Sequence, residues 1–489
     1  MHIAFDNSYA RDLEGCYVPW QPASVPAPRL LHLNRALADE LGLDADALQG
    51  EAGARLFSGN QVPASASPLA QAYAGHQFGG FSPQLGDGRA LLLGEVIDRH
   101  GRRRDIAFKG SGRTPFSRGG DGKAALGPVL REVLVGEAMH ALGIPTTRAL
   151  AVAATGEPVQ REQVLPGAVL TRVAASHLRV GTFQFFAARG QQDELRRVAE
   201  HAIARHDPDL AGLPDRHLQL LRRVAQRQAS LVATWMNVGF IHGVMNTDNM
   251  TISGETIDYG PCAFMEAYDP EAVFSSIDHG GRYAYRNQPL IARWNLARLA
   301  EALLPLLADE PEAAIAPATE VIDAFPAWFD AAWRAGQRAK LGLAQAQAGD
   351  DTLADDWLTL LQAQQVDFTL AWRHLADAAE GRDTTLAELF MDRAALAAWL
   401  ARWHQRLAAE GGDAAARAAA MRRANPRIIA RNHRVEEALA AASDDDDLGP
   451  FEQLLAALQH PFGDDSRFDR YAEPAPPELT ARYRTFCGT

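Results

Sequence analysis

The first clear hydrophobic pattern in the chain is a pair of apolar runs separated by a turn. Residues 90–97 are almost continuously apolar, His100-Gly101 follows, and residues 105–109 form a second run that ends in a lysine. Short apolar runs joined by turn residues are typical of a β-hairpin. Residues 149–153 and 168–173 have the same character. We therefore expect a small sheet in this part of the chain.

Apolar residues at helical spacing predict one helix within the sheet region and many helices after it. Residues 126–142 carry Leu, Val and Met at helical intervals, with a Gly-Pro pair near the start. Residues 193–204 and 218–238 repeat this periodicity, and beyond Trp294 the chain is rich in Ala and Leu. Two short strands are expected around the turn at Ser253-Gly254. The second half of the chain is therefore predicted to be mainly helical.

These patterns divide the chain into four parts. Residues 1–75 are rich in Pro and Ala, with weakly periodic helical stretches such as 30–43, and are expected to form an N-terminal arm or cap. Residues 76–185 should form a small β-rich lobe, and residues 186–300 a helical lobe. Residues 301–489 are expected to form a long helical extension.

Composition and charge exclude several classes of protein. Hydrophobic residues make up 47% and charged residues 22% of the 489 residues, which is typical of a globular chain. The net charge of −13 has the wrong sign for a protein that coats nucleic acid or anionic lipid. There is no apolar run of about 18 residues, as a membrane span needs. The three cysteines are too few for a disulfide framework. We expect a cytoplasmic protein with no nucleic-acid or membrane partner.

Lys109 is the first candidate for a chemical role, because it closes an apolar strand. The chain has only three lysines among its 48 basic residues. A buried lysine is costly without an anionic partner, and Glu132, about twenty residues later on the predicted helix, could supply one. Kinase-like folds use this pairing to hold a lysine ready for nucleotide phosphates. A lysine that merely reaches solvent at a strand end is the alternative.

A glycine-rich, basic loop at residues 110–123 follows Lys109. It contains two arginines and a second lysine, and glycine lets backbone N–H groups approach a polyphosphate closely. A disordered surface loop is the alternative interpretation. A shorter turn, Gly86-Asp-Gly-Arg89, precedes the first strand of the hairpin. Arg172 and Arg179 flank a sharp turn where the last predicted strand of the sheet ends, and either could also be an ordinary surface arginine.

The strongest local signal is the segment from His242 to Asn249, followed by Asp258 in Asp-Tyr-Gly. Its spacing matches the H-R-D-x-x-x-x-N loop and D-F-G of protein kinases, in which the Asn and the second Asp bind Mg²⁺. Val244 occupies the position of the kinase base, and valine cannot accept a proton. The nearest carboxylate is that of Asp248, so in an enzyme of this kind the base would have moved along the loop.

With these residues assembled, the chain resembles the selenoprotein O family of kinase-like proteins. The resemblance runs from Phe5 to Cys487 and is carried by residues 73–80, 84–89, 109–122, 243–249 and 257–261. It implies an α+β, protein kinase-like fold with a small β-rich lobe and a helical lobe. It also implies that ATP binds in a flipped orientation and that AMP, with release of pyrophosphate, is transferred to Ser, Thr or Tyr hydroxyls of protein substrates.

The resemblance also implies roles for individual residues. Asp248 matches the proton acceptor, Asn249 and Asp258 match the ligands of Mg²⁺ or Mn²⁺, and Glu132 would orient Lys109. Nucleotide contacts are implied for Gly86, Gly88, Arg89, Lys109, Asp121, Gly122, Arg172, Arg179 and Asp258.

Several alternatives stay open on sequence grounds. A kinase that transfers the γ-phosphate and a non-catalytic pseudokinase scaffold that only binds nucleotide are the rival functions. A monomer is compatible with the sequence, which does not decide the oligomeric state. Some bacterial relatives carry a cysteine where this chain reads Phe274-Ser-Ser276, so redox control by a disulfide between Cys262 and Cys487 is in doubt.

Overall fold

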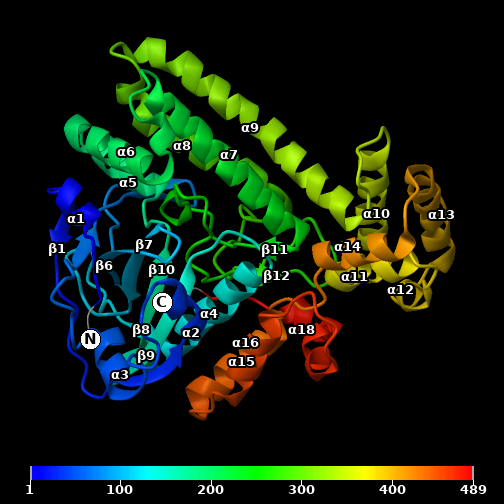
Figure 1. Cartoon of the computed structure of the whole chain (residues 1–489), viewed down its shortest axis with the longest axis horizontal. Coiled ribbons are helices and arrows are strands. Elements are labelled where there is room, and N and C mark those ends of the chain that lie inside the picture. The colour runs from blue at the N-terminus through cyan, green and yellow to red at the C-terminus, as the bar shows by residue number, and fades with distance from the viewer. Residues whose placement is uncertain (1–2, 487–489) are drawn as a thin grey trace.

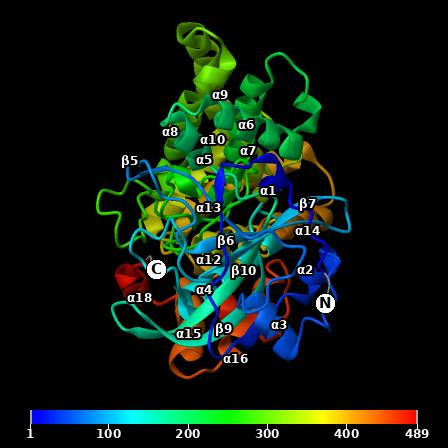
Figure 2. The same cartoon turned by 90° about the vertical axis from the view of Figure 1, so that its left-hand side faces the viewer.

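The structure, a computed structural model, describes residues 3–486 as a mixed α/β protein. The strands of the main sheet gather at one end of the molecule, and helices form the other end (Figure 1). A second view looks onto the sheet, with α5–α9 above it and α15 and α16 below (Figure 2). Cys487 lies outside the described residues. None of the helices within 3–486 combines the length and the apolar character needed to cross a bilayer.

The main sheet is antiparallel wherever its strands pair. The order is β1 (Tyr17–Pro19), β3 (Leu69–Gln71), β6 (Ala90–Ile97), β7 (Arg103–Lys109), β10 (Val164–Ala174), β9 (Arg148–Gln160) and β2 (Arg29–Leu33), and β8 (Ala124–Ala125) pairs with β10. The predicted hairpin is confirmed, because β6 pairs with β7 and places Ala90 opposite Lys109. The two later strands are confirmed as β9 and β10, both longer than their apolar runs suggested.

The N-terminal segment contributes strands to this sheet. Residues 30–43 were expected to be helical, and the first part of this prediction is wrong. Leu30 lies in β2 and pairs with Ala153 of β9, so pairing with a distant strand outweighs weak helical periodicity. The remaining elements of this segment are α1 (Ser8–Asp12), α2 (Arg35–Glu40), α3 (Gly50–Phe57) and the hairpin of β4 (Gly75–Gln77) and β5 (Gly80–Ser82).

The predicted helix after the hairpin is α4 (Leu126–Ala141). Its apolar residues, among them Leu130, Val133 and Leu134, are fully buried. The helix contacts β9 and β10 on one side and α15 (Asn432–Asp444) and α16 (Gly449–Leu458) on another. Both sides of α4 are therefore covered, which fits its largely apolar sequence.

The other helices follow the predicted change to helical structure. The expected helices at 193–204 and 218–238 are confirmed as α6 and α7. The bounds are α5 (Val180–Ala187), α6 (Gln192–His206), α7 (Arg216–Asn237), α8 (Gln288–Leu307), α9 (Pro311–Lys340), α10 (Asp350–Gln364), α11 (Phe368–Ala378), α12 (Thr384–Glu388), α13 (Arg393–Glu410), α14 (Ala414–Ala424), α17 (Asp469–Ala472) and α18 (Pro477–Arg482).

The segment between α7 and α8 differs from its prediction. The two strands expected around Ser253-Gly254 are absent; the short strands of this region are β11 (Phe240–Ile241) and β12 (Ala263–Phe264), which pair with each other. The backbone beside the turn instead makes isolated bridges to other elements, Thr251 to Arg179 and Thr256 to Thr146. Tertiary partners have replaced the local hairpin.

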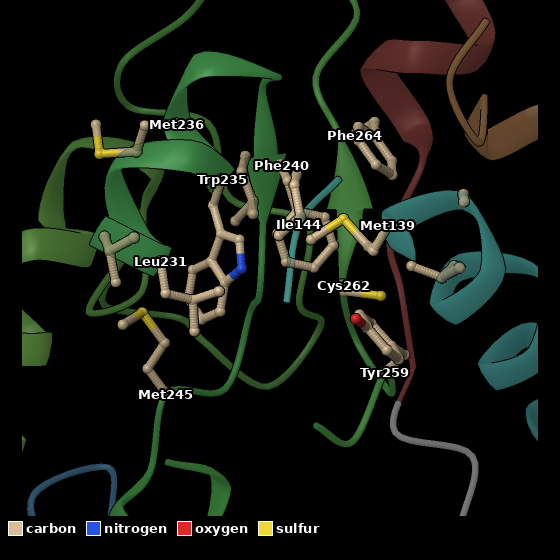
Figure 3. Close-up of a cluster of buried hydrophobic side chains, with 14 of the residues drawn as sticks. Met139, Ile144, Leu231, Trp235, Met236, Phe240, Met245, Tyr259, Cys262 and Phe264 are labelled. Carbon is tan, nitrogen blue, oxygen red and sulfur yellow. The ribbon is translucent and has the colours of Figure 1, made fainter. Parts of the chain in front are cut away.

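A buried aromatic and sulfur-containing cluster fixes the loop that joins these short strands. Trp235 of α7 packs against Phe240, and Phe240 packs against Phe264 and Tyr259 (Figure 3). The indole of Trp235 donates a hydrogen bond to the hydroxyl of Thr256 at 2.8 Å. The backbone that carries Asp258 is therefore anchored on both sides by core contacts.

Candidate active site

A cleft of about 1480 Å³ lies between the sheet, α4, the 244–261 segment and the C-terminal part of the chain. Every residue singled out from the sequence for nucleotide, metal or proton-transfer chemistry lines it: Gly86, Gly88, Arg89, Lys109, Asp121, Gly122, Glu132, Arg172, Arg179, Asp248, Asn249 and Asp258. Residues up to 172 positions apart thus share one cavity. Their individual roles stay predictions.

Four charged side chains that line this cleft form a compact cluster. Lys109 Nζ lies 2.5 Å from Glu132 Oε2 and 3.0 Å from Asp258 Oδ1. Arg172 Nη1 lies 3.0 Å from Glu132 Oε1 and 2.8 Å from the same oxygen of Asp258. Each carboxylate therefore contacts both cations.

Sheet register places the two cations of this cluster together. Arg172 of β10 lies opposite Ala107 of β7, two residues before Lys109. Side chains two residues apart on a strand point to the same face, so Arg172 and Lys109 emerge on the face that α4 covers. Glu132 on α4 is buried and reaches both of them.

The cluster keeps its carboxylates ionised. Burial acts to raise the pKa of Asp258, but Lys109, Arg172 and Arg179 outweigh burial and hold that pKa well below its ordinary value. Burial likewise opposes ionisation of Glu132, and Lys109 and Arg172 lower its pKa. Asp258 has a left-handed backbone, with φ of 61°, a conformation that Asp adopts more readily than most residues. This conformation is part of what directs its side chain into the cluster.

Arg179 is a third buried cation beside this cluster. It precedes α5, and only 2% of it is exposed. Its Nη2 lies 3.8 Å from Asp258 Oδ2, its Nη1 lies 3.6 Å from Asp87 Oδ1, and its guanidinium lies over the ring of Tyr73 at 4.4 Å. Among residues 3–486 its Nε and Nη1 have no hydrogen-bond acceptor. A buried guanidinium with unused donors is suited to an anionic ligand.

Asp248 supplies the carboxylate of the 244–249 loop. It lies in a short 3₁₀ helix, Thr247–Asn249, and its Oδ2 accepts a hydrogen bond from Gln77 Nε2 at 3.3 Å. Its Oδ1 is buried and has no hydrogen-bond donor within the described chain. Burial raises the pKa of Asp248 to about 6, although Arg179 acts to lower it. An oxygen without a donor is free to accept a proton or a cation.

The oxygen atoms around Asp258 and Asn249 fit a hard divalent cation. Asn249 uses its amide nitrogen to bond the carbonyl of Val244 at 3.0 Å, so its amide oxygen is the atom that a cation would take. No group of three His, Cys, Asp or Glu residues suited to a metal occurs in the part of the chain that the structure describes. Mg²⁺ sites often take one or two protein oxygens and complete their shell with phosphates and water, so the carboxylate of Asp258 and the amide oxygen of Asn249 could serve as ligands.

His242 holds the loop rather than facing the cleft. It is buried, and its Nε2 donates a hydrogen bond to the carbonyl of Ile257 at 2.9 Å. Its Nδ1 accepts a weaker bond from the backbone N–H of Val244 at 3.4 Å. These contacts tie the loop that carries Asn249 to the residue before Asp258.

The glycine-rich segments approach each other too closely for side chains at two positions. A Cβ at Gly86, where φ is 70°, would lie 2.3 Å from the ring of Phe116. A Cβ at Gly122, where φ is 68°, would lie 2.1 Å from the carbonyl oxygen of Gly112. Asp121 is held by Arg161 Nη1 at 2.8 Å. The loop is therefore built by specific contacts, against the alternative of a disordered surface loop.

The C-terminal segment is part of the cleft, which sequence reasoning missed. Thr485 pairs with residues 274–276: its N–H donates to the Phe274 carbonyl at 2.8 Å, and the Ser276 N–H donates to its carbonyl at 2.9 Å. Its hydroxyl donates to the carbonyl of Pro261 at 2.7 Å. No local signal in the sequence marks a contact across some 200 residues. The neighbouring tail residues that line the cleft are Arg482, Tyr483, Arg484 and Phe486.

Within the described residues, both cysteines, Cys16 and Cys262, are free thiols. Cys262 is buried, and burial raises the pKa of its thiol to about 12, so it is a protonated core residue. Cys16 is also a free, buried thiol. The sequence left a disulfide between Cys262 and Cys487 in doubt, and Cys487 lies outside the described part of the chain.

Comparison with known proteins decides the family. The family model described as protein adenylyltransferase SelO matches residues 1–459. The chain belongs to the SelO family. Proteins named protein nucleotidyltransferase YdiU are similar to it along its length: that of Cereibacter sphaeroides is 65% identical over 490 residues, covering 100% of both chains. That of Chromobacterium violaceum is 63% identical over 474 residues, covering 97% of this chain and 99% of the relative. That of Rhodopseudomonas palustris is 58% identical, with 100% of both chains covered.

The resemblance inferred from the motifs is thus confirmed, and the SelO-family chain is an enzyme of the nucleotidyltransferase class.

Proposed function

We propose that this SelO-family protein transfers AMP from ATP to Ser, Thr or Tyr hydroxyls of protein substrates and releases pyrophosphate. One observation carries the proposal. The charged cluster of Lys109, Glu132, Arg172 and Asp258 lies in the same cleft as Asp248, whose Oδ1 has no donor among the described residues. Cations for phosphate and a free carboxylate for a hydroxyl proton thus meet in one cavity.

The proposed fold is the two-lobed, protein kinase-like one. A strand lysine paired with a helical glutamate, as in Lys109 and Glu132, is the arrangement that kinases use. We assign residues 76–185 to the small lobe, 186–300 to the helical lobe and 301–489 to the helical extension. Residues 1–75 form the N-terminal part whose strands join the sheet.

The position of the free carboxylate favours transfer of AMP over transfer of phosphate. In an ordinary kinase the base stands where this chain has Val244, which lines the cleft but cannot accept a proton. With ATP reversed, Lys109, Arg172 and Arg179 bind the β- and γ-phosphates, and the α-phosphorus lies toward Asp248. The glycine-rich segments and Arg89 would contact the remainder of the nucleotide, together with Asp121.

The proposed step is an in-line displacement at the α-phosphorus. The acceptor oxygen forms a bond to that phosphorus, the bond to the bridging oxygen of the β-phosphate breaks, and pyrophosphate leaves. Asp248 accepts the hydroxyl proton on its free oxygen. The buried cations stabilise the negative charge that collects on pyrophosphate. Asn249 and Asp258 would hold Mg²⁺ or Mn²⁺, which supplies further neutralisation of phosphate charge when bound.

Labelled ATP distinguishes this function from its rivals. With ATP labelled at the α-phosphate, the protein substrate should become labelled; with γ-labelled ATP it should not. Intact mass should show the addition of AMP. Asp258→Ala should abolish labelling. Asp356, a half-buried aspartate on α10, does not line the cleft, so Asp356→Ala should retain labelling. Label from the γ-phosphate would support a kinase, and labelling by neither in the presence of ATP binding would support a scaffold.

A further inference from the structure

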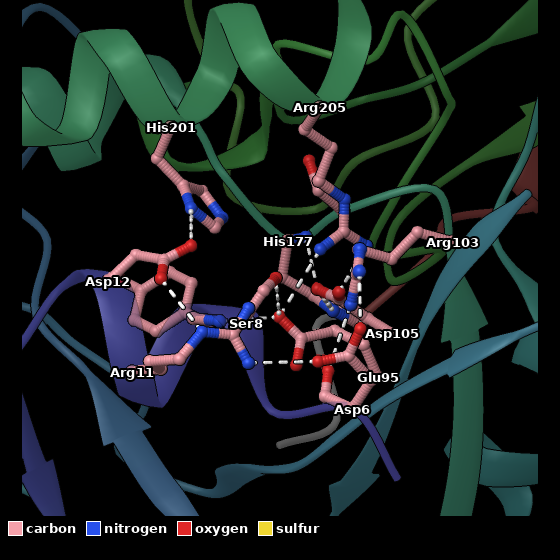
Figure 4. A network of polar contacts seen from close by, with 12 residues as sticks. Asp6, Ser8, Arg11, Asp12, Glu95, Arg103, Asp105, His177, His201 and Arg205 are labelled. Atoms are coloured by element: carbon pink, nitrogen blue, oxygen red, sulfur yellow. Dashed lines mark hydrogen bonds and ion pairs between the residues drawn. The ribbon is translucent and has the colours of Figure 1, made fainter.

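A chain of buried polar contacts connects Arg172 to residues that do not line the cleft. The Nε of Arg172 donates to Nε2 of His177 at 3.3 Å. The Nδ1 of His177 lies 2.9 Å from Asp105 Oδ2, and that oxygen also accepts the backbone N–H of His177 at 2.8 Å. Arg205 of α6 contacts the other oxygen of Asp105 at 2.5 Å (Figure 4). The ring of His177 is therefore held between Asp105 of β7 and Arg172 of β10.

The network continues to the N-terminal segment. Arg205 also lies 3.4 Å from Glu95 Oε1. The same oxygen accepts a hydrogen bond from the hydroxyl of Ser8 at 2.8 Å (Figure 4). It also accepts one from the backbone N–H of Tyr9 at 2.7 Å. Ser8 and Tyr9 are therefore at one end of a polar network whose other end is Arg172.

The contacts determine the protonation state of His177. An arginine Nε–H can only donate, so Nε2 of His177 must accept and the ring proton must sit on Nδ1, directed at Asp105. The ring is 3% exposed, and burial together with the nearby arginines lowers its pKa despite Asp105. His177 is thus a neutral imidazole with a single defined tautomer, able to orient a neighbour without adding charge.

We propose that His177, fixed by Asp105, is a positioning residue for the transfer reaction. It holds the guanidinium of Arg172 in the orientation in which Nη1 meets both Glu132 and Asp258. Without the hydrogen bond from its Nε to His177, Arg172 keeps its charge, but the plane of its guanidinium is no longer fixed. The inference rests on the proposed function, since it assigns how one of the phosphate-binding cations is aimed.

Two substitutions at position 177 separate the two sides of the ring. His177→Asn retains an N–H for Asp105 near the place of Nδ1 but offers nothing to Arg172. His177→Gln offers an amide oxygen near the place of Nε2. We expect His177→Asn to lower kcat/KM for transfer by about 10-fold to 100-fold, as loss of an orienting partner does elsewhere, and His177→Gln to lower it less. Activity of His177→Asn within twofold of wild type would overturn the proposal.

A matched control separates positioning from general loss of a buried histidine. His217 is also buried and pairs with a carboxylate, Glu200, at 2.9 Å, but it does not line the cleft. His217→Asn should lower the melting temperature about as much as His177→Asn and leave kcat/KM unchanged. Equal losses of activity from the two variants would mean that His177 acts only through stability.

A double-mutant cycle tests that His177 acts through Arg172. Arg172→Lys removes the Nε–H that His177 accepts, so adding His177→Asn to it should lower kcat/KM by less than about 3-fold more. A full additional loss would overturn the proposal. The same cycle is run on ATP affinity by calorimetry, with the full chain. That readout tests the positioning of Arg172 even if the labelling experiment assigns a different transferred group.

Discussion

Asp248→Asn should stabilise the protein while abolishing transfer. The substitution preserves shape and leaves an oxygen to accept from Gln77, but it removes a charge that burial penalises. The pKa of Asp248 is about 6 in the folded protein against an ordinary 3.8. A difference of about two units at roughly 1.4 kcal/mol each corresponds to about 3 kcal/mol. Activity should fall because the proposed proton acceptor is gone.

The pH dependence of this gain follows from the sign of the shift. The folded pKa is raised, so the cost of the charged carboxylate is present in full above about pH 6 and disappears as the pH falls toward 3.8. Urea unfolding in the presence of EDTA, so that no divalent cation lowers the pKa, should show a gain of about 3 kcal/mol at pH 7.5. At pH 4.5 the gain should be less than half of that.

Asp258→Asn provides the matched control, because the same chemical change should have the opposite sign there. Asp258 is held ionised by three cations, and its neutralisation leaves Lys109, Arg172 and Arg179 facing each other without their shared anion. We expect a loss of about 3–5 kcal/mol at pH 7.5. A loss of stability for Asp248→Asn at that pH, or a gain that does not change between pH 7.5 and 4.5, would refute the reasoning.

Three further substitutions test other parts of the structure. Lys340 is buried, burial lowers its pKa to about 7, and its amine lies over the rings of Phe368 and Trp372. In urea titrations, Lys340→Met should raise the free energy of unfolding by about 2–5 kcal/mol at pH 6, by less at higher pH and by almost nothing near pH 10.5. Gly86→Ala places a methyl group against Phe116 and should weaken ATP binding at least tenfold by calorimetry, whereas Gly190→Ala, with a similar φ of 67° and open space, should leave it unchanged. Arg431→Met leaves the carboxylates of Glu266 and Asp367 without their shared cation. Denaturant unfolding should show a loss of about 3–5 kcal/mol in the free energy of unfolding at pH 8 and a smaller loss at pH 5; equal losses at both pH values would contradict this account.

Much of the site was predictable because its motifs are local. The hairpin that carries Lys109, the helix that carries Glu132 and the loop from His242 to Asn249 each show their structure in a short window of sequence. The pairing of Lys109 with Glu132 was expected from their spacing, and the structure places them 2.5 Å apart. The absence of a base at Val244 was also visible without coordinates.

The burial of Arg172 and Arg179 was not predictable from their neighbourhood. In the sequence both resemble surface arginines beside the turn that ends a strand. Their burial depends on β10 being a central strand and on the 250–252 segment pairing with the start of α5. The strand at residues 29–33 likewise takes its conformation from β9 rather than from its own periodicity.

The sequence by itself determined which residues are available for nucleotide chemistry, because hydrophobic periodicity and motif spacing are properties of a few adjacent turns or strands. Only the tertiary structure decided that Thr485 pairs with residues 274–276, that Ser8 closes a network ending at Arg172, and that His177 takes a single tautomer. The contacts of Ser8 with Glu95, of His177 with Asp105 and of Thr485 with Phe274 join residues about 70 to more than 200 positions apart. These contacts stabilise the fold because buried polar groups satisfy each other's hydrogen bonds. No local pattern in the sequence specifies which groups will be paired.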